Sequence, residues 1–161
     1  MSAASFPSRP RQTGQRRKTF AIVASQYNAE YVNGLVDHAR KELEAIASTF
    51  QVTVYEVPGA FEIPVVAQEL AMRQAADVII ALGVIIEGAT QHAALIGQTI
   101  TGALMQIALG QRIPVVHEVL LVKDEEQARV RCLGEDINRG TEAARVAARM
   151  AQVMSEVRSE R

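Results

Sequence analysis

The residues best suited to chemistry lie in short segments that follow apolar runs. Gly88, Ala89 and Thr90 precede a helical pattern, so their backbone N–H groups can hold an anion such as phosphate at the positive end of the helix dipole. A simple glycine turn, with Thr90 or Gln91 capping the helix, is the alternative. His92 opens the same helix, and histidine is suited to proton transfer near neutral pH; a structural or capping role is its alternative.

Aromatic and charged residues stand in similar positions elsewhere. Tyr27 and Phe61 can form an apolar wall for a planar ring, or can pack at the rim of the protein. Glu62 can accept hydrogen bonds from a ligand, or add charge to a first helical turn. Arg131 and Arg139 can clamp an anion because a guanidinium binds phosphate through two hydrogen bonds, although each alone also fits a surface charge.

Several classes of site are excluded by missing patterns. The three histidines show no HExxH or similar ligand spacing, which predicts no metal site; one of them, His117, falls inside an apolar run. No GxxxxGK[ST] or GxGxxG motif is present, so nucleoside triphosphate and dinucleotide binding lose their main support. No GxSxG motif marks a nucleophile, and Cys132, beside apolar Val130 and Leu133, is expected to be inert packing.

From Thr19 onward, short apolar runs alternate with longer segments of helical period. Strands are predicted at 19–25, 51–57, 77–86 and 114–122. The start of each helix has its own signal: Asn28 as an N-cap, Pro64 in a first turn opening near Phe61, Gln91, the capping-box pair Asp124 and Gln127, and Asn138. The run at 77–86 is apolar on both faces, as in a central parallel strand.

This alternation predicts a three-layer α/β/α sandwich, flavodoxin-like, with a four-stranded parallel sheet. Ligands bind such folds beyond the carboxyl ends of the strands. Four loops are therefore expected to form the site: SQYN (25–28), PGAFE (58–62), EGATQH (87–92) and VKDEEQ (122–127).

Length and charge define the domain. The chain has 161 residues, of which 48% are hydrophobic and 22% charged, which suits one globular domain, expected at 19–158. Residues 1–18 carry five basic residues and no acid, which predicts a disordered basic arm. The rest holds 12 basic and 18 acidic residues, a net charge of −6, which disfavours nucleic-acid binding.

No apolar run approaches the roughly 20 residues of a membrane helix and no signal sequence is visible, so a cytoplasmic protein is expected.

Five segments in this order, SQYN, PGAFEIP, GVIIEGATQH, EEQARVR and NRGTEAA, resemble those of the 6,7-dimethyl-8-ribityllumazine synthases, over about residues 19–154. The resemblance implies a flavodoxin-like transferase of riboflavin biosynthesis. Such an enzyme condenses 5-amino-6-ribitylaminouracil with 3,4-dihydroxy-2-butanone 4-phosphate, releases phosphate and water, and requires no cofactor or metal. The site would be shared between neighbouring subunits.

The resemblance also implies residue roles. His92 would transfer protons, Ala89 and Thr90 would bind the butanone phosphate, and Arg131 would reach in from the adjacent subunit. The ribitylaminouracil would contact the aromatic Tyr27, the stacking Phe61, and Ala60, Glu62, Val84, Ile85 and Ile86. The neighbour-side wall would include His117, where the family has phenylalanine, Arg139, where it has lysine, and Glu142.

Other positions depart from the family pattern. Glu87 replaces an arginine before Gly88, and Gln91, Ala93 and Glu118 replace a proline, an aromatic residue and a glycine. Two other functions stay open: a riboflavin synthase of the archaeal type, which the GATQH loop disfavours, and a non-catalytic flavin- or lumazine-binding or shell-forming homologue.

Assembly is predicted from the alanine-rich last helix and from a site that needs two chains. Both indicate a homo-oligomer. The resemblance offers a homopentamer or an icosahedral capsid of sixty subunits, with riboflavin synthase as a partner; no nucleic acid or membrane partner is expected.

Overall fold

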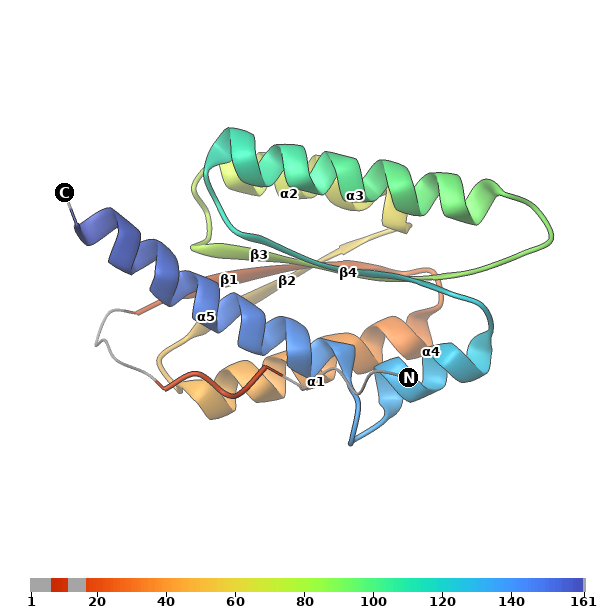
Figure 1. Ribbon diagram of the computed structural model, residues 1–161, viewed down its shortest axis with the longest axis horizontal. Coiled ribbons are helices and arrows are strands. Elements are labelled where there is room, and N and C mark those ends of the chain that lie inside the picture. The colour runs from red at the N-terminus through yellow and green to blue at the C-terminus, as the bar shows by residue number, and fades with distance from the viewer. Residues whose placement is uncertain (1–6, 12–16, 161) are drawn as a thin grey trace.

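The computed structural model describes residues 7–11 and 17–160 and centres on one parallel sheet (Figure 1). Its strands are β1 (Thr19–Ser25), β2 (Gln51–Val57), β3 (Val78–Ile86) and β4 (Val115–Val122). They are ordered β2-β1-β3-β4 and every neighbouring pair is parallel. The order reverses direction after β1, so the loops that follow β1 and β3 leave the sheet side by side.

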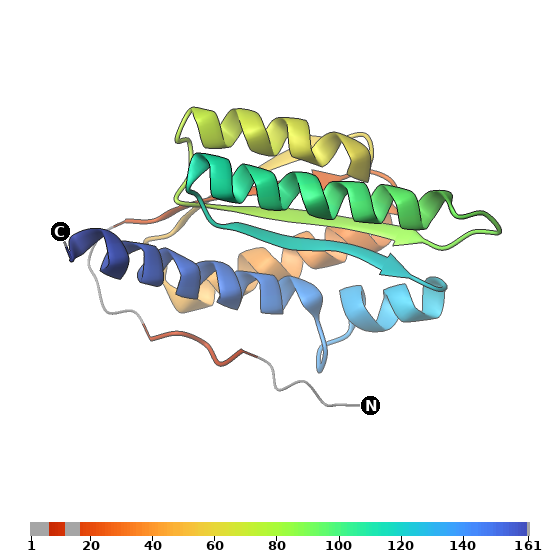
Figure 2. The ribbon, with the colours of Figure 1, turned by 45° about the horizontal axis from the view of Figure 1, so that its top comes forward.

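Helices cover both faces of the sheet (Figures 1 and 2). One face carries α1 (Ala29–Ile46), α4 (Glu125–Leu133) and α5 (Arg139–Ser159). The other carries α2 (Ile63–Met72), entered through the 3-10 turn η1 (Ala60–Glu62), and α3 (His92–Gln111). The predicted three-layer, flavodoxin-like sandwich with four parallel strands is confirmed.

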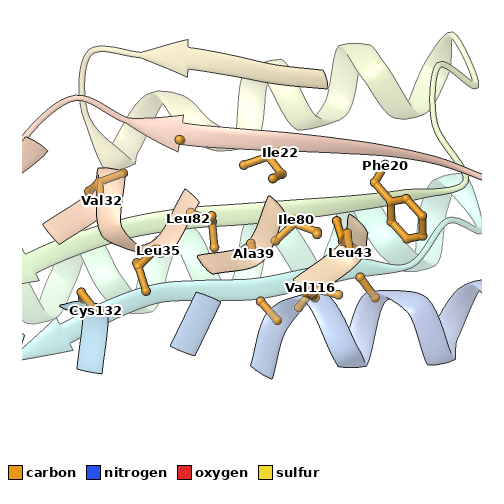
Figure 3. Packing of buried hydrophobic residues seen from close by; sticks show 14 of the residues in the cluster. Phe20, Ile22, Val32, Leu35, Ala39, Leu43, Ile80, Leu82, Val116 and Cys132 are labelled. Carbon is orange, nitrogen blue, oxygen red and sulfur yellow. The ribbon is translucent and has the colours of Figure 1, made fainter. Parts of the chain in front are cut away.

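Two apolar cores lie on the two faces because successive strand residues point in opposite directions. Phe20 and Ile22 of β1 belong to the core on the α1 and α5 side, and Figure 3 shows them in the same packed layer as Leu35 and Leu43 of α1. Ala21 and Val23 belong to the core under α2 and α3. β3 is buried on both sides from its first residue to Val84, as its continuous apolar sequence predicts.

The alanine-rich face of α5 packs inside the chain. Ala143, Ala144, Ala147, Ala148 and Ala151 are all buried in the core with α1. Small side chains let the two helices approach closely, and a Cβ at Gly140 would lie 2.2 Å from the carbonyl oxygen of Leu35. This alanine stripe is therefore used within the protein, so the inference of subunit contact from it is wrong.

The cap predicted at Asp124 is confirmed, and the structure adds one at Asn138. Asp124 accepts a hydrogen bond from the Gln127 amide (2.8 Å), and Asn138 accepts from two amides in the first turn of α5. Asn28 stands at the N-cap of α1 but makes no side-chain cap. Its backbone is left-handed (φ 56°), and Nδ2 donates instead to the carbonyl oxygen of Val84, 2.8 Å away. The side chain thus ties the loop after β1 to β3.

Part of the predicted disordered arm lies outside the described residues, namely 1–6 and 12–16. Residues 7–11 extend beside α1 and α5 (Figure 2), and side-chain hydrogen bonds link them to both helices. The boundaries of the domain stay a prediction.

Helix α3 has a property that the sequence analysis missed. Within the described part of the chain it is the one helix long and apolar enough, by length and composition alone, to cross a membrane. Core helices of soluble proteins pass the same test. Several of its apolar side chains are nevertheless exposed in the single chain, among them Leu95, Met105 and Leu109.

Candidate active site

A cleft of about 380 Å³ opens at the carboxyl ends of β1 and β3. Three of the four predicted loops contribute to it. Its lining consists of Tyr27, Asn28, Gly59, Ala60, Phe61, Glu62, Val84, Ile85, Ile86, His92 and Ile96. The structure thus brings together the predicted aromatic wall, the carboxylate, the end of β3 and the histidine. Its position is the one that the strand order requires.

The two aromatic rings are unusually exposed for residues of their size. Tyr27 is 75% exposed and Phe61 is 60% exposed. Backbone hydrogen bonds join their loops, since the amides of Gln26 and Tyr27 donate to the carbonyl oxygens of Val57 and Pro58. The rings are therefore held on firm backbone while their faces are available to a planar ligand.

His92 is the first residue of α3 and lies exposed at the mouth of the cleft. The N-cap position, Gln91, makes no side-chain hydrogen bond to the helix amides. Ala89 and Thr90 precede it and are exposed, and neither lines the cleft in the single chain. Amides that no side chain caps, at the positive end of a 20-residue helix, suit an anion bound beside His92.

The structure shows residues in and near the cleft that sequence reasoning missed. Asn28, through its bond to Val84, joins the loop after β1 to β3 and lines the cleft. Ile96 also lines it, and its position one helical turn after His92 was a usable signal. Ser25, at the end of β1, is 4% exposed, and its hydroxyl has no hydrogen-bond partner among the described residues.

The fourth predicted loop does not reach the cleft. Residues 123–127 are used to start α4, where the Gln127 side chain accepts from the amide of Lys123 (3.2 Å) and Asp124 accepts from Gln127. The loop after β4 leads into α4, on the face of the sheet opposite α2 and α3, whereas the loop after β2 leads into η1 and α2 beside the cleft. Placing this loop in the site of one chain was wrong for that reason.

The remaining predicted residues lie away from this cleft. Arg131 is on α4, while Arg139 and Glu142 begin α5, on the opposite face of the sheet from α2 and α3. Arg139 Nη1 donates to Glu142 Oε2 at 2.5 Å. A single chain therefore does not join them to His92.

His117 is held between β4 and α3. Its Nδ1 accepts from the amide of Val119 (3.1 Å), and its Nε2 lies 2.7 Å from Thr101 Oγ1, whose own proton goes to the carbonyl of Gly97. This network assigns the proton to Nε2. Burial lowers the pKa of His117, so the ring is neutral near pH 7.

Two groups on β4 and α4, the half-buried Glu118 and the buried Cys132, have raised pKa values. Burial raises the pKa of Glu118 to about 7, against the opposing effect of Arg139 and with a further increase from Glu142. Burial likewise raises the pKa of Cys132 to about 11. The thiol is therefore protonated and fully buried, which confirms inert packing. Among the described residues, no three His, Cys, Asp or Glu side chains are grouped to hold a metal ion.

Comparison with known proteins covers the whole folded region. The family model for 6,7-dimethyl-8-ribityllumazine synthase matches residues 17–155. The chain belongs to the 6,7-dimethyl-8-ribityllumazine synthase family. A lumazine synthase of Chlorobium limicola is 40% identical over 138 residues, covering 83% of this chain and 87% of the relative. One of Kineococcus radiotolerans is 42% identical over 125 residues, covering 76% of each chain.

The lumazine synthase family match includes all residues that line the cleft and also Arg131, Arg139 and Glu142 outside it. A third relative, from Burkholderia cenocepacia, is 38% identical over 133 residues, 82% of this chain and 75% of its own. Glu87 is the first residue after β3, and its amide donates a hydrogen bond to the carbonyl oxygen of Val122. Its side chain is exposed next to Gly88.

Proposed function

We propose that the chain catalyses the condensation of 5-amino-6-ribitylaminouracil with 3,4-dihydroxy-2-butanone 4-phosphate to 6,7-dimethyl-8-ribityllumazine, phosphate and water. The observation that carries the proposal is the cleft itself. It combines two exposed aromatic rings, the carboxylate of Glu62 and a histidine at the uncapped start of a helix, in a chain of the lumazine synthase family.

The pyrimidine is proposed to lie against Phe61. Stacking of a base on an aromatic ring contributes about 1–3 kcal/mol, and the exposed ring of Phe61 has little intramolecular packing to lose. Glu62 accepts hydrogen bonds from N–H or O–H groups of the ribitylaminouracil, Ala60 and Val84–Ile86 shape the pocket, and Tyr27 closes the side opposite. A cleft lined by aromatic and apolar residues, with one carboxylate, suits a flat molecule that has polar groups at its edge.

The phosphate ester is proposed to bind at the start of α3, over Ala89 and Thr90. The helix dipole and the uncapped amides favour a dianion there, whereas Glu87 opposes it. Imine formation, phosphate elimination and ring closure all move protons, and His92 is the group in the cleft placed to move them. Holding both reactants together supplies several kcal/mol of the acceleration.

A second copy of the chain is proposed to complete the site. Arg131, Arg139 and Glu142 lie on the other face of the sheet and can face a substrate only from a neighbouring subunit, as can His117 from the edge strand. The single chain also exposes an apolar face on α2 and α3, whose members Val65, Met72, Leu95, Met105 and Leu109 are 59–72% exposed. Faces of this kind mark interfaces.

The assembly is proposed to consist of homopentamers, either as a single pentamer or as an icosahedral capsid of sixty subunits. Sedimentation of the purified protein distinguishes the two, and a monomer would contradict a shared site. We also propose a cytoplasmic location and riboflavin synthase as a partner.

The activity is tested by mixing the protein with both substrates. Lumazine absorbance and phosphate release are followed in parallel against the uncatalysed background. Equal rates of both products above background are expected. An assembled oligomer that binds lumazine without forming it would instead establish the non-catalytic binding or shell function.

A further inference from the structure

A second cleft, of about 760 Å³, lies on the opposite side of the molecule from the candidate active site. Its walls are residues 7–11 and the middle of α5, which run side by side in Figure 2. Four arginines line it, namely Arg9, Arg11, Arg145 and Arg149. One carboxylate among the described residues, Glu156, lines it with them.

The cleft is built by side-chain bonds that hold residues 7–11 in place. Glu42 on α1 accepts from Arg9 Nε and Nη2, both at 2.9 Å, and from Arg145 Nε at 2.8 Å. Farther along, Gln152 Nε2 donates to the carbonyl of Arg11 at 2.6 Å. Arg145 Nη1 donates to the carbonyl of Pro7 at 3.1 Å. The backbone of the segment is thus attached at both ends, and the side chain of Arg9 is held as well.

The charges of the cleft do not cancel. Glu42 lies beneath the lining and offsets one positive charge, since it is shared by Arg9 and Arg145. Arg149 and Glu156 are 3.5 Å apart and both more than half exposed, a pair that contributes little. Four guanidinium groups and two carboxylates leave an excess of two positive charges, which matches a phosphate dianion.

The lining also has an apolar part. Val146 and Met150 of α5 and Pro10 of the facing segment lie among the arginines. The volume is within the range of small-molecule sites. The basic area of the cleft is too small to bind nucleic acid, because that requires positive charge clustered along a longer surface.

We propose that this cleft binds a small organic phosphate monoester. The phosphate lies between Arg11 and Arg149, and the organic group lies on Val146 and Met150. The site is separate from the cleft that holds Phe61, because the sheet lies between the two helical layers. The assignment therefore goes beyond the proposed function and does not depend on it.

Isothermal titration calorimetry with phenyl phosphate tests the assignment. Full-length protein carrying Arg131→Ala is used, so that the phosphate site proposed for catalysis is weakened while the cleft is intact. One site per chain is expected, and phenol, which lacks the phosphate, should not bind. Inorganic phosphate should bind more weakly than phenyl phosphate; equal affinity would overturn the organic part of the assignment.

Two charge variants complete the test. Arg11→Ala with Arg149→Ala should weaken phenyl phosphate binding by at least about tenfold, because each charged hydrogen bond contributes roughly that factor. The matched control, Arg73→Ala with Arg129→Ala, removes two exposed arginines elsewhere and should change affinity less than about twofold. Absence of binding, or equal effects of the two double variants, would overturn the proposal without affecting the proposed catalysis.

Discussion

Replacing Glu42 with glutamine removes the charge that joins α1, α5 and residues 7–11 while keeping the side-chain volume. Glu42 is 9% exposed and its partner Arg145 is 21% exposed, so this pair is well shielded from water. The side chain of Arg9 is 51% exposed, so its ion pair with Glu42 contributes little to the stability of the fold. Loss of one charged hydrogen bond, with Arg145 left partly buried beside a neutral amide, is expected to lower the free energy of unfolding by about 2–3 kcal/mol.

Urea denaturation at one fixed protein concentration measures this change, because assembly couples stability to concentration. Glu44→Gln, an exposed position on the same helix, is the matched control and should change stability by less than about 0.5 kcal/mol. A Glu42→Gln effect as small as that of the control would refute the reasoning.

The effect should also depend on pH. The hydrogen bonds from Arg9, together with a smaller effect of Arg145, lower the pKa of Glu42 below its ordinary value against the opposing effect of burial. A carboxyl group with a lowered pKa in the folded state stabilises the protein above its unfolded pKa, about 4.3, and loses that contribution as the pH falls through the folded pKa. Wild type and Glu42→Gln should therefore converge in acid. A difference that persists unchanged there would contradict an ionic origin.

Four further outcomes are expected. His92→Ala should lower turnover by about one to three orders of magnitude with sedimentation unchanged; full turnover would remove His92 from the chemistry. Arg131→Ala should raise the KM for the phosphate substrate more than that for the pyrimidine, and equal changes would make Arg131 structural. Because burial raises the pKa of Glu118 to about 7, wild type should lose stability relative to Glu118→Gln in urea titrations as the pH rises from about 4.3, the unfolded pKa, to about 7, with no further loss above; parallel profiles would contradict this. Ser25→Ala should be neutral or stabilising by about 1 kcal/mol, since it removes a buried hydroxyl that has no hydrogen-bond partner among the described residues; a loss above 1 kcal/mol would show that the hydroxyl is satisfied.

Local patterns predicted the elements well because their causes are local. The alternation of Phe20, Ala21 and Ile22 follows from side chains that leave a strand on opposite faces, and β1 and β2 begin and end where the sequence analysis placed them. Asp124 and Asn138 cap helices because short polar side chains reach amides two or three residues away. Asn28 has the same chemistry but bonds to β3, a strand that its sequence neighbourhood does not reveal.

The site was predictable only in part. Tyr27, Phe61 and His92 were found because parallel strands end at one edge of the sheet, so their loops must meet. The loop at 123–127 was misplaced because the face of the sheet that each helix covers is decided by packing between distant segments, and α4 covers the face opposite α2 and α3. The role of the alanines in α5 was likewise invisible, since a stripe of small residues looks the same whether it faces α1 or another subunit.

The sequence by itself determined the periodicity of the strands and helices, most of their ends and the loops that carry the aromatic ring and histidine. Only the tertiary structure decided which partner each polar side chain has. Glu42 and Arg145 stand 103 positions apart, and residues 7–11 reach them from a third segment. The periodicity of apolar residues along the sequence indicates the face of a helix or strand on which a residue lies. Which buried charges form a pair depends on which segments pack together and on how well that packing shields the charges from water.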